Sequence, residues 1–406
     1  MRKRRHLWSI YSLLISMVTA LSGCSPDRDS PGLHEAELLP LWSVQPADTD
    51  SEPWFGEIAD VAVDAHSVYI ADRSRRTIIV LDADGHHVRK IGRSGSGPGE
   101  FGILRRVSVS PSGSIYVVSG GYSTISKFDA GGQFVDRRDH SQLVSEDLQA
   151  SLALPLVLDD STFVYQLSPH PWRSQEEQLA IPPLLRVRPT GIDALGERSL
   201  SKPVQAAIGS FPQVSGFAYV EPFTIGEVCP GPGRGETLFV RSVDPYTVYR
   251  FDEHGSSSTF TFWNVERDEI HDWIELIEMP YEEWRESIRA TDPRYLGEWP
   301  ILQEEIPPKV HRSFSFRHTL RGLARNNGRL AILAESVTED FRQGVPGSGL
   351  ERFVYVVDLT EEKATARAPV NAPGSFQLEG MLDDGSLILS TNDPVPGVFA
   401  FRLIHQ

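Results

Sequence analysis

Residues 60–85 read DVAVDAHSVYIADRSRRTIIVLDADG and carry the clearest evidence for the fold. A second stretch, RVSVSPSGSIYVVSGGYSTISKFDAG at residues 106–131, repeats its pattern, with Tyr69 matching Tyr116. Apolar and polar residues alternate in both, which is typical of half-buried strands, and a turn containing glycine ends each third strand. With fourth strands at residues 87–91 and 133–137, each unit is predicted to form four short antiparallel strands.

Four antiparallel strands in about 45 residues is the period of one β-propeller blade. Fainter copies of the pattern follow at residues 161–191, 237–255, 322–359 and 378–403. The predicted fold class is therefore all-β, a six-bladed β-propeller with four-stranded antiparallel blades over residues 36–406. Seven blades is the alternative.

The last blade indicates how the ring closes. The chain stops at Gln406, directly after the third strand of this blade, and residues 37–45 form a lone strand-like run near the other end. Because an open ring would leave unpaired strand edges, we expect the N-terminal strand to complete the last blade.

The segments VAVD, VYIAD and IIVLDADG, followed by GRSGSGPGEF, resemble the NHL-repeat class of six-bladed propellers, which is close to the TolB-like propellers. The chain is similar in particular to bacterial lipoproteins described only as six-bladed β-propeller proteins. The resemblance is carried by residues 55–137 and implies the same fold.

The N-terminus has the pattern of a lipoprotein signal. A basic start, MRKRR, precedes an apolar run at residues 7–21 and the sequence Leu21-Ser22-Gly23-Cys24, which resembles a lipobox. We expect a signal peptide at residues 1–23, lipidation of Cys24 and a polar tether at residues 24–35. This predicts an extracytoplasmic protein of the bacterial cell envelope, held on the membrane by its N-terminal lipid. A plain secretory signal is the alternative.

The composition of the chain excludes one class of partner and one class of fold. The formal net charge of −16 argues against nucleic acid, which requires a basic face. Two cysteines in 406 residues exclude a disulfide scaffold. The second cysteine, Cys229, is expected to be structural.

Residues 265–311 are predicted to form a helical cap between blades four and five. Ile270, Trp273, Ile274 and Ile277 have helical spacing, and Trp284 continues after Pro280. Packing onto the propeller and covering the channel mouth are the two interpretations of this insertion.

Strand order places the long loops and the blade connections on one face. The candidate binding residues expected there are Arg73, Arg75, Arg76, Trp273, Trp284, Arg312, Arg317 and His318. Arginine side chains bind carboxylates and phosphates. No nucleophile elbow, zinc motif or calcium loop is present in the sequence, so neither a catalytic residue nor a cofactor is predicted.

The sequence therefore favours a membrane-anchored binding or scaffold propeller that presents its loop-rich face to a protein, peptide or glycan. The alternative is a divalent-cation-dependent hydrolase or lactonase with its site in the central channel. Lactonases related to six-bladed propellers hold their cation with Glu, Asn and Asp. Asparagine is scarce here, so no catalytic residue is transferred from them; the candidates are Asn264, Asn326, Asn327, Asn371 and Asn392.

Overall fold

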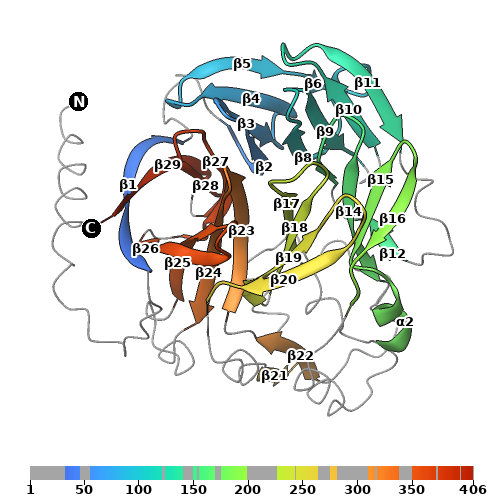
Figure 1. Ribbon diagram of the computed structural model, residues 1–406. Helices are drawn as coiled ribbons and strands as arrows, with labels where there is room; N and C mark the ends of the chain where they lie inside the picture. Colours follow the sequence, from blue (N-terminus) through green and yellow to red (C-terminus); the bar gives the residue numbers. More distant parts are fainter. Residues whose placement is uncertain are drawn as a thin grey trace, which may run out of the picture. The chain divides into compact units, whose positions relative to one another are not determined.

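The computed structural model describes residues 33–45, 55–120, 124–139, 150–152, 155–169, 175–198, 226–242, 244–263, 275–280, 310–315, 318–337, 350–371, 374–393 and 395–405. Six antiparallel blades stand in a ring (Figure 1), the last two joined to each other by short parallel pairings, which confirms the predicted all-β six-bladed propeller. None of the helices in these ranges is long and apolar enough to cross a membrane.

Blades one and two have the predicted strands. Blade one contains β2 (Ile58–Val63), β3 (Ser67–Asp72), β4 (Thr77–Asp82) and β5 (His87–Ile91). Blade two contains β8 (Leu104–Val109), β9 (Ile115–Ser119), β10 (Thr124–Phe128) and β11 (Phe134–Asp139). A short parallel pair, β6 (Arg93–Ser94) with β7 (Glu100–Phe101), lies in the connection between the two blades.

Blades three and four follow the same order. Blade three contains β12 (Ala150–Leu152), β13 (Leu156–Val157), β14 (Phe163–Pro169), β15 (Leu184–Arg188) and β16 (Gly191–Leu195), with the short helix α2 (Gln175–Ala180) between β14 and β15. Blade four contains β17 (Gly226–Pro230), β18 (Thr237–Arg241), β19 (Asp244–Phe251) and β20 (Ser257–Thr261).

Blade five contains β23 (His318–Asn326), β24 (Arg329–Val337), β25 (Leu350–Asp358) and β26 (Lys363–Pro369). Blade six contains β27 (Gln377–Met381), β28 (Leu387–Thr391), β29 (Gly397–His405) and β1 (His34–Val44). Strand β1 runs antiparallel to β29 from Ala36 opposite His405 to Val44 opposite Val398, as predicted for ring closure.

Two contacts join the closing strand and its blade to their neighbours. The indole Nε1 of Trp42 in β1 donates a hydrogen bond to the carbonyl of Ala83 in blade one, at 2.8 Å. Innermost strands β23 and β27 meet at Gly322, where a Cβ would lie 2.2 Å from the carbonyl oxygen of Leu378. With a φ of +136° as well, this position requires glycine.

The helical cap is not found where the structure describes the insertion. Glu275–Pro280 forms strand β21, which pairs antiparallel with β22 (Val310–Ser315), so the prediction of a helix through Ile277 is wrong. A short apolar run does not distinguish helix from strand until its partner is known. Here the partner segment, Val310–Ser315, supplies the backbone hydrogen bonds. Residues 264–274 and 281–309 lie outside the described residues.

The core lies between neighbouring blades rather than in one centre. Blades one and two share a cluster that includes Ile78, Phe101 and Phe128, all at most 1% exposed. Blades four and five meet at aromatic rings, where Tyr246 packs edge-on against Tyr355 at 5.7 Å between centroids. The blades hold the innermost strands in fixed positions around the axis.

Candidate functional site

A cavity of about 890 Å³ occupies the centre of the ring. Its walls come from the innermost strand of every blade: β2, β8, β13, β17, β23 and β27. The lining extends to the turns between first and second strands, at Asp64, Ser110 and Asp383. The cavity therefore reaches the short-turn face, opposite the face on which the sequence placed the candidate binding residues.

Irregular pairing brings charged side chains to this cavity. The register shifts between Ile58 and Asp60 in β2 and between Leu104 and Arg106 in β8. Strand β27 has the same irregularity around Glu379, between Leu378 and Gly380. A β-bulge changes the direction of the side chains beside it. Irregularities in three blades thus accompany Asp60, Arg106 and Glu379 in the channel wall.

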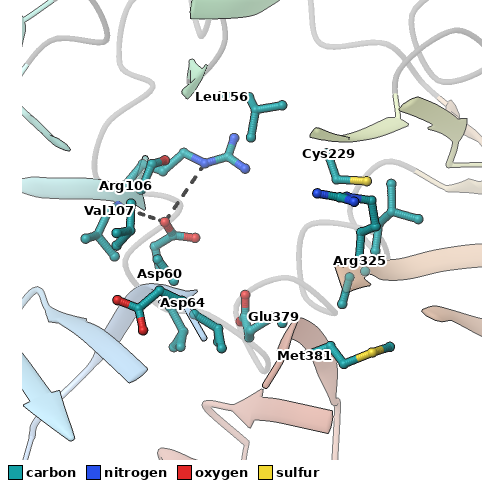
Figure 2. A pocket seen from close by; sticks show the side chains of 18 of the residues that line it. Asp60, Asp64, Arg106, Val107, Leu156, Cys229, Arg325, Glu379 and Met381 are labelled. Atoms are coloured by element: carbon teal, nitrogen blue, oxygen red, sulfur yellow. Dashed lines mark hydrogen bonds and ion pairs between the residues drawn. The ribbon is translucent and has the colours of Figure 1, made fainter. Parts of the chain in front are cut away.

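Asp60 and Arg106 face each other across the boundary between blades one and two (Figure 2). The carboxylate of Asp60 lies 3.9 Å from Nε of Arg106 and accepts a 2.8 Å hydrogen bond from the backbone N–H of Val107. Burial raises the pKa of Asp60 to about 6, against the opposing effect of Arg106 and of this N–H. The charge of Glu227 also raises it.

Glu379 and Glu227 add two more carboxyl groups. Glu379 in β27 accepts a hydrogen bond from the hydroxyl of Ser390. Burial, and then the charge of Asp60, raise the pKa of Glu379 to about 8, so this side chain holds its proton at neutral pH. Burial also raises the pKa of Glu227 in β17, although Arg106 opposes the shift.

The opposite wall carries a second guanidinium group. Figure 2 shows Arg325 of β23 directed into the cavity beside Cys229 of β17. The Nε atom of Arg325 is buried and has no hydrogen-bond partner in the part of the chain that the structure describes. Cys229 is buried, and burial raises the pKa of its thiol to about 12, so it is protonated at neutral pH.

The cavity therefore combines three carboxyl groups with guanidinium groups in surroundings partly shielded from water. Such groups bind a charged ligand through charge-assisted hydrogen bonds more strongly than they would at an open surface. The channel carboxylates are not among the groups close enough to share one ion. Within the described ranges, the one set of three possible ligand atoms within 4.8 Å of one another belongs to Asp82, Asp84 and His86, at the outer turn after β4.

The three arginines of the β3–β4 turn lie outside the cavity lining. Arg73 forms a 2.6 Å ion pair with Glu57, and Arg75 lies 3.8 Å from Asp72. Arg76, with a left-handed φ of 57°, donates to the hydroxyl of Ser94. These contacts join the turn to the two connections beside it.

His318 is also outside the lining, at the start of β23. Its Nδ1 lies 2.8 Å from the hydroxyl of Ser336 and 3.1 Å from that of Tyr246, and its ring packs edge-on against Tyr246. Arg312 is in β22, opposite Glu278. Cys24, Trp273, Trp284 and Arg317 fall outside the described residues.

The charged channel residues are not among the site residues predicted from the sequence, although two of them lie in the quoted repeats. Asp60 and Arg106 are the first residues of the two quoted repeats. An ionisable side chain at the same place in two innermost strands was the available signal. Asn392, considered among the few asparagines, does line the cavity, but its amide is bonded to the backbone N–H and carbonyl of Ile58.

Comparison with known proteins agrees with this architecture. A family model described as a 6-bladed beta-propeller matches residues 35–168. A crystal structure from Bacteroides vulgatus, of a member of a family of unknown function, is similar with a TM-score of 0.55 and 8% identity, over 92% of this chain and 99% of that one. A Bacteroides fragilis structure described as an exported protein has a TM-score of 0.50 and 13% identity, over 94% and 98% of the two chains.

At 8% and 13% sequence identity, the similarity to these two structures shows a shared fold and no more. No curated protein matches the sequence. The fold and the cavity define a six-bladed β-propeller whose central channel is lined by charged side chains from five of its blades.

Proposed function

We propose that this protein is an exported binding propeller that holds a small polar ligand in its central channel. The observation that supports this function is the set of ionisable side chains that different blades contribute to one cavity of about 890 Å³. Ligand sites in proteins have volumes of about 300–1,000 Å³ and a few convergent polar groups. Burying charged groups lowers the stability of the folded protein unless they are paired. A role in ligand binding accounts for their position in the channel.

The lipobox-like sequence ending at Cys24 supports export and anchoring of the propeller through lipid. The similar structure from Bacteroides fragilis is described as an exported protein, which is consistent with export of this protein. The loop-rich face remains our proposed contact for a protein, peptide or glycan in the envelope. The ligand and such a partner would occupy opposite faces of one scaffold.

A library of small polar compounds of every charge class tests the channel site. We expect one or more compounds to raise the melting temperature of the purified protein, and the effect to disappear in Ser108→Trp, which places a bulky ring on the channel wall. Ser258→Trp, on the exposed outermost strand β20, is the matched control. A shift that persists in Ser108→Trp would place binding elsewhere and overturn the proposal.

The second candidate function is a divalent-cation-dependent hydrolase or lactonase. The carboxyl oxygens of Asp60, Glu227 and Glu379 are of the kind that hard cations prefer, although these three groups are not close enough to one another in this structure to share one ion. Elemental analysis of the purified protein decides between the two functions. Stoichiometric calcium or zinc that is lost in Glu379→Gln would support the enzyme; metal-free protein that binds an organic ligand would support the binding propeller.

A further inference from the structure

The two signs of charge alternate around the channel wall. The carboxyl groups belong to Asp60, Glu227 and Glu379, which are contributed by blades one, four and six. The guanidinium groups that extend into the cavity belong to Arg106 of blade two and Arg325 of blade five (Figure 2). A ligand inside the cavity is therefore within reach of both kinds of group.

The carboxyl groups of the channel offer a place for a positive group. Arg106 is placed close to Asp60 at 3.9 Å, whereas Glu379 is bonded to a neutral hydroxyl. The mouth of the cavity carries two further carboxylates, Asp64 and Asp383. An ammonium group would find several acceptors here, and the acidic mouth would favour its entry.

The guanidinium groups of the channel offer a place for a negative group. The guanidinium group of Arg325 is directed into the cavity, and its buried Nε has no partner among the described residues. Arg106 approaches from the facing wall (Figure 2). Guanidinium groups bind carboxylates with two parallel hydrogen bonds, so an acid group between these arginines would be held from both sides.

We propose that the channel binds a small zwitterion of amino-acid chemistry, with its ammonium group between Asp60 and Glu379 of the adjacent blades one and six and its carboxylate at Arg106 and Arg325. This inference rests on the proposed function and specifies its ligand class. A zwitterion matches the site because each of its charges replaces water at groups of the opposite sign, whereas a ligand with one charge meets only one of the two kinds of group. The cavity of about 890 Å³ accommodates a free amino acid or a dipeptide.

The test uses matched probes on the full-length purified protein. The panel contains the twenty free amino acids and alanyl-alanine, each with its amide, which lacks the negative charge, and its N-acetyl derivative, which lacks the positive charge. Calorimetry is expected to detect binding of at least one zwitterion, with affinity at least about tenfold higher than that of either derivative, a factor of ten being 1.4 kcal/mol. Titration in two buffers of different ionisation enthalpy is expected to show proton release, because an ammonium group beside Glu379 favours its ionised form.

Two variants test whether the zwitterion binds at the carboxyl group of Glu379 and at the guanidinium group of Arg325. Glu379→Gln keeps the shape of the side chain and is expected to weaken the zwitterion about tenfold or more while leaving its N-acetyl derivative unaffected. Arg325→Gln is expected to weaken the zwitterion to the same degree while leaving its amide unaffected. Melting curves without ligand verify that each variant folds, and Arg402→Gln, exposed on β29 and paired with Asp384, is the control.

The outcomes separate this inference from the proposed function. If neutral or singly charged compounds bind best and Ser108→Trp abolishes their binding, the channel function holds and the zwitterion proposal is wrong. If no compound in either panel binds in a way that depends on Ser108, Glu379 or Arg325, both are wrong. Equal affinity of a zwitterion and its two derivatives also overturns the ligand class.

Discussion

The carboxylate of Asp60 accepts a hydrogen bond from the backbone N–H of Val107 at 2.8 Å, which joins the innermost strands of blades one and two. The same carboxylate lies 3.9 Å from the guanidinium Nε of Arg106 and faces the central cavity. One side chain therefore belongs both to the contact between two blades and to the channel wall. A change at Asp60 would therefore alter both the charged channel wall and the contact between the two blades.

The acid groups of the channel predict how stability depends on pH. The pKa of Glu379 is raised from 4.5 to about 8 in the folded protein, so its contribution to stability is full below about 4.5 and is lost as the pH rises through about 8. Urea unfolding is expected to show a decline in stability between pH 5 and 8.5, and a smaller decline in Glu379→Gln. Glu351→Gln, exposed on β25, should keep the wild-type slope. A wild-type slope in Glu379→Gln would show that this carboxyl group is ionised in the folded protein at neutral pH.

Arg186 is expected to be a major source of stability between blades three and four. Its side chain is 1% exposed and donates to the backbone carbonyls of Gly235, Asp252 and Glu253. Arg186→Met leaves these acceptors without a donor and is expected to lower the free energy of unfolding by about 3–5 kcal/mol. Arg188→Met removes a half-exposed neighbour that also pairs with Asp193, at an expected loss below about 1 kcal/mol. Equal losses in chemical denaturation would contradict this assignment.

The closing strand is expected to stabilise the whole ring. Deleting residues 25–46 removes β1, which pairs with β29 along its length and carries the Trp42 contact to blade one. We expect the melting temperature to fall by more than about 10 °C, because the edges of β29 and β26 lose their partner. Deleting residues 25–32 retains β1 and is the comparison. Identical melting of the two deletions would mean that closure contributes little.

Lipidation of Cys24 is tested apart from the fold. Cys24→Ala is expected to move the protein from the membrane fraction to the soluble fraction, or to block its maturation, because acyl chains contribute about 0.8 kcal/mol for each buried methylene. Ser25→Ala keeps the cysteine and should fractionate like the wild type. Membrane association of Cys24→Ala at the wild-type level would contradict the lipobox interpretation.

Local sequence pattern predicted most of the ring. Strand β5 was expected at residues 87–91 and is found there, because alternation and glycine turns report burial of one face over a few residues. The pairing of β1 with β29 was also predicted, since a blade without its outer strand needs one. The insertion was mistaken for a helix where Glu275–Pro280 is a strand, because its partner Val310–Ser315 is thirty residues further along the chain.

The repeat of four strands and the order of the blades follow from short-range periodicity and turn chemistry, and both can be read from the amino-acid sequence. The channel site exists only once the chain has folded. Asp60, Glu227 and Glu379 are far apart in the chain, and each is one polar residue in an ordinary strand. They line one cavity because the ring brings every innermost strand to the axis, and register shifts lie beside Asp60 in β2 and Glu379 in β27. Burial there changes their pKa values, which no local pattern encodes.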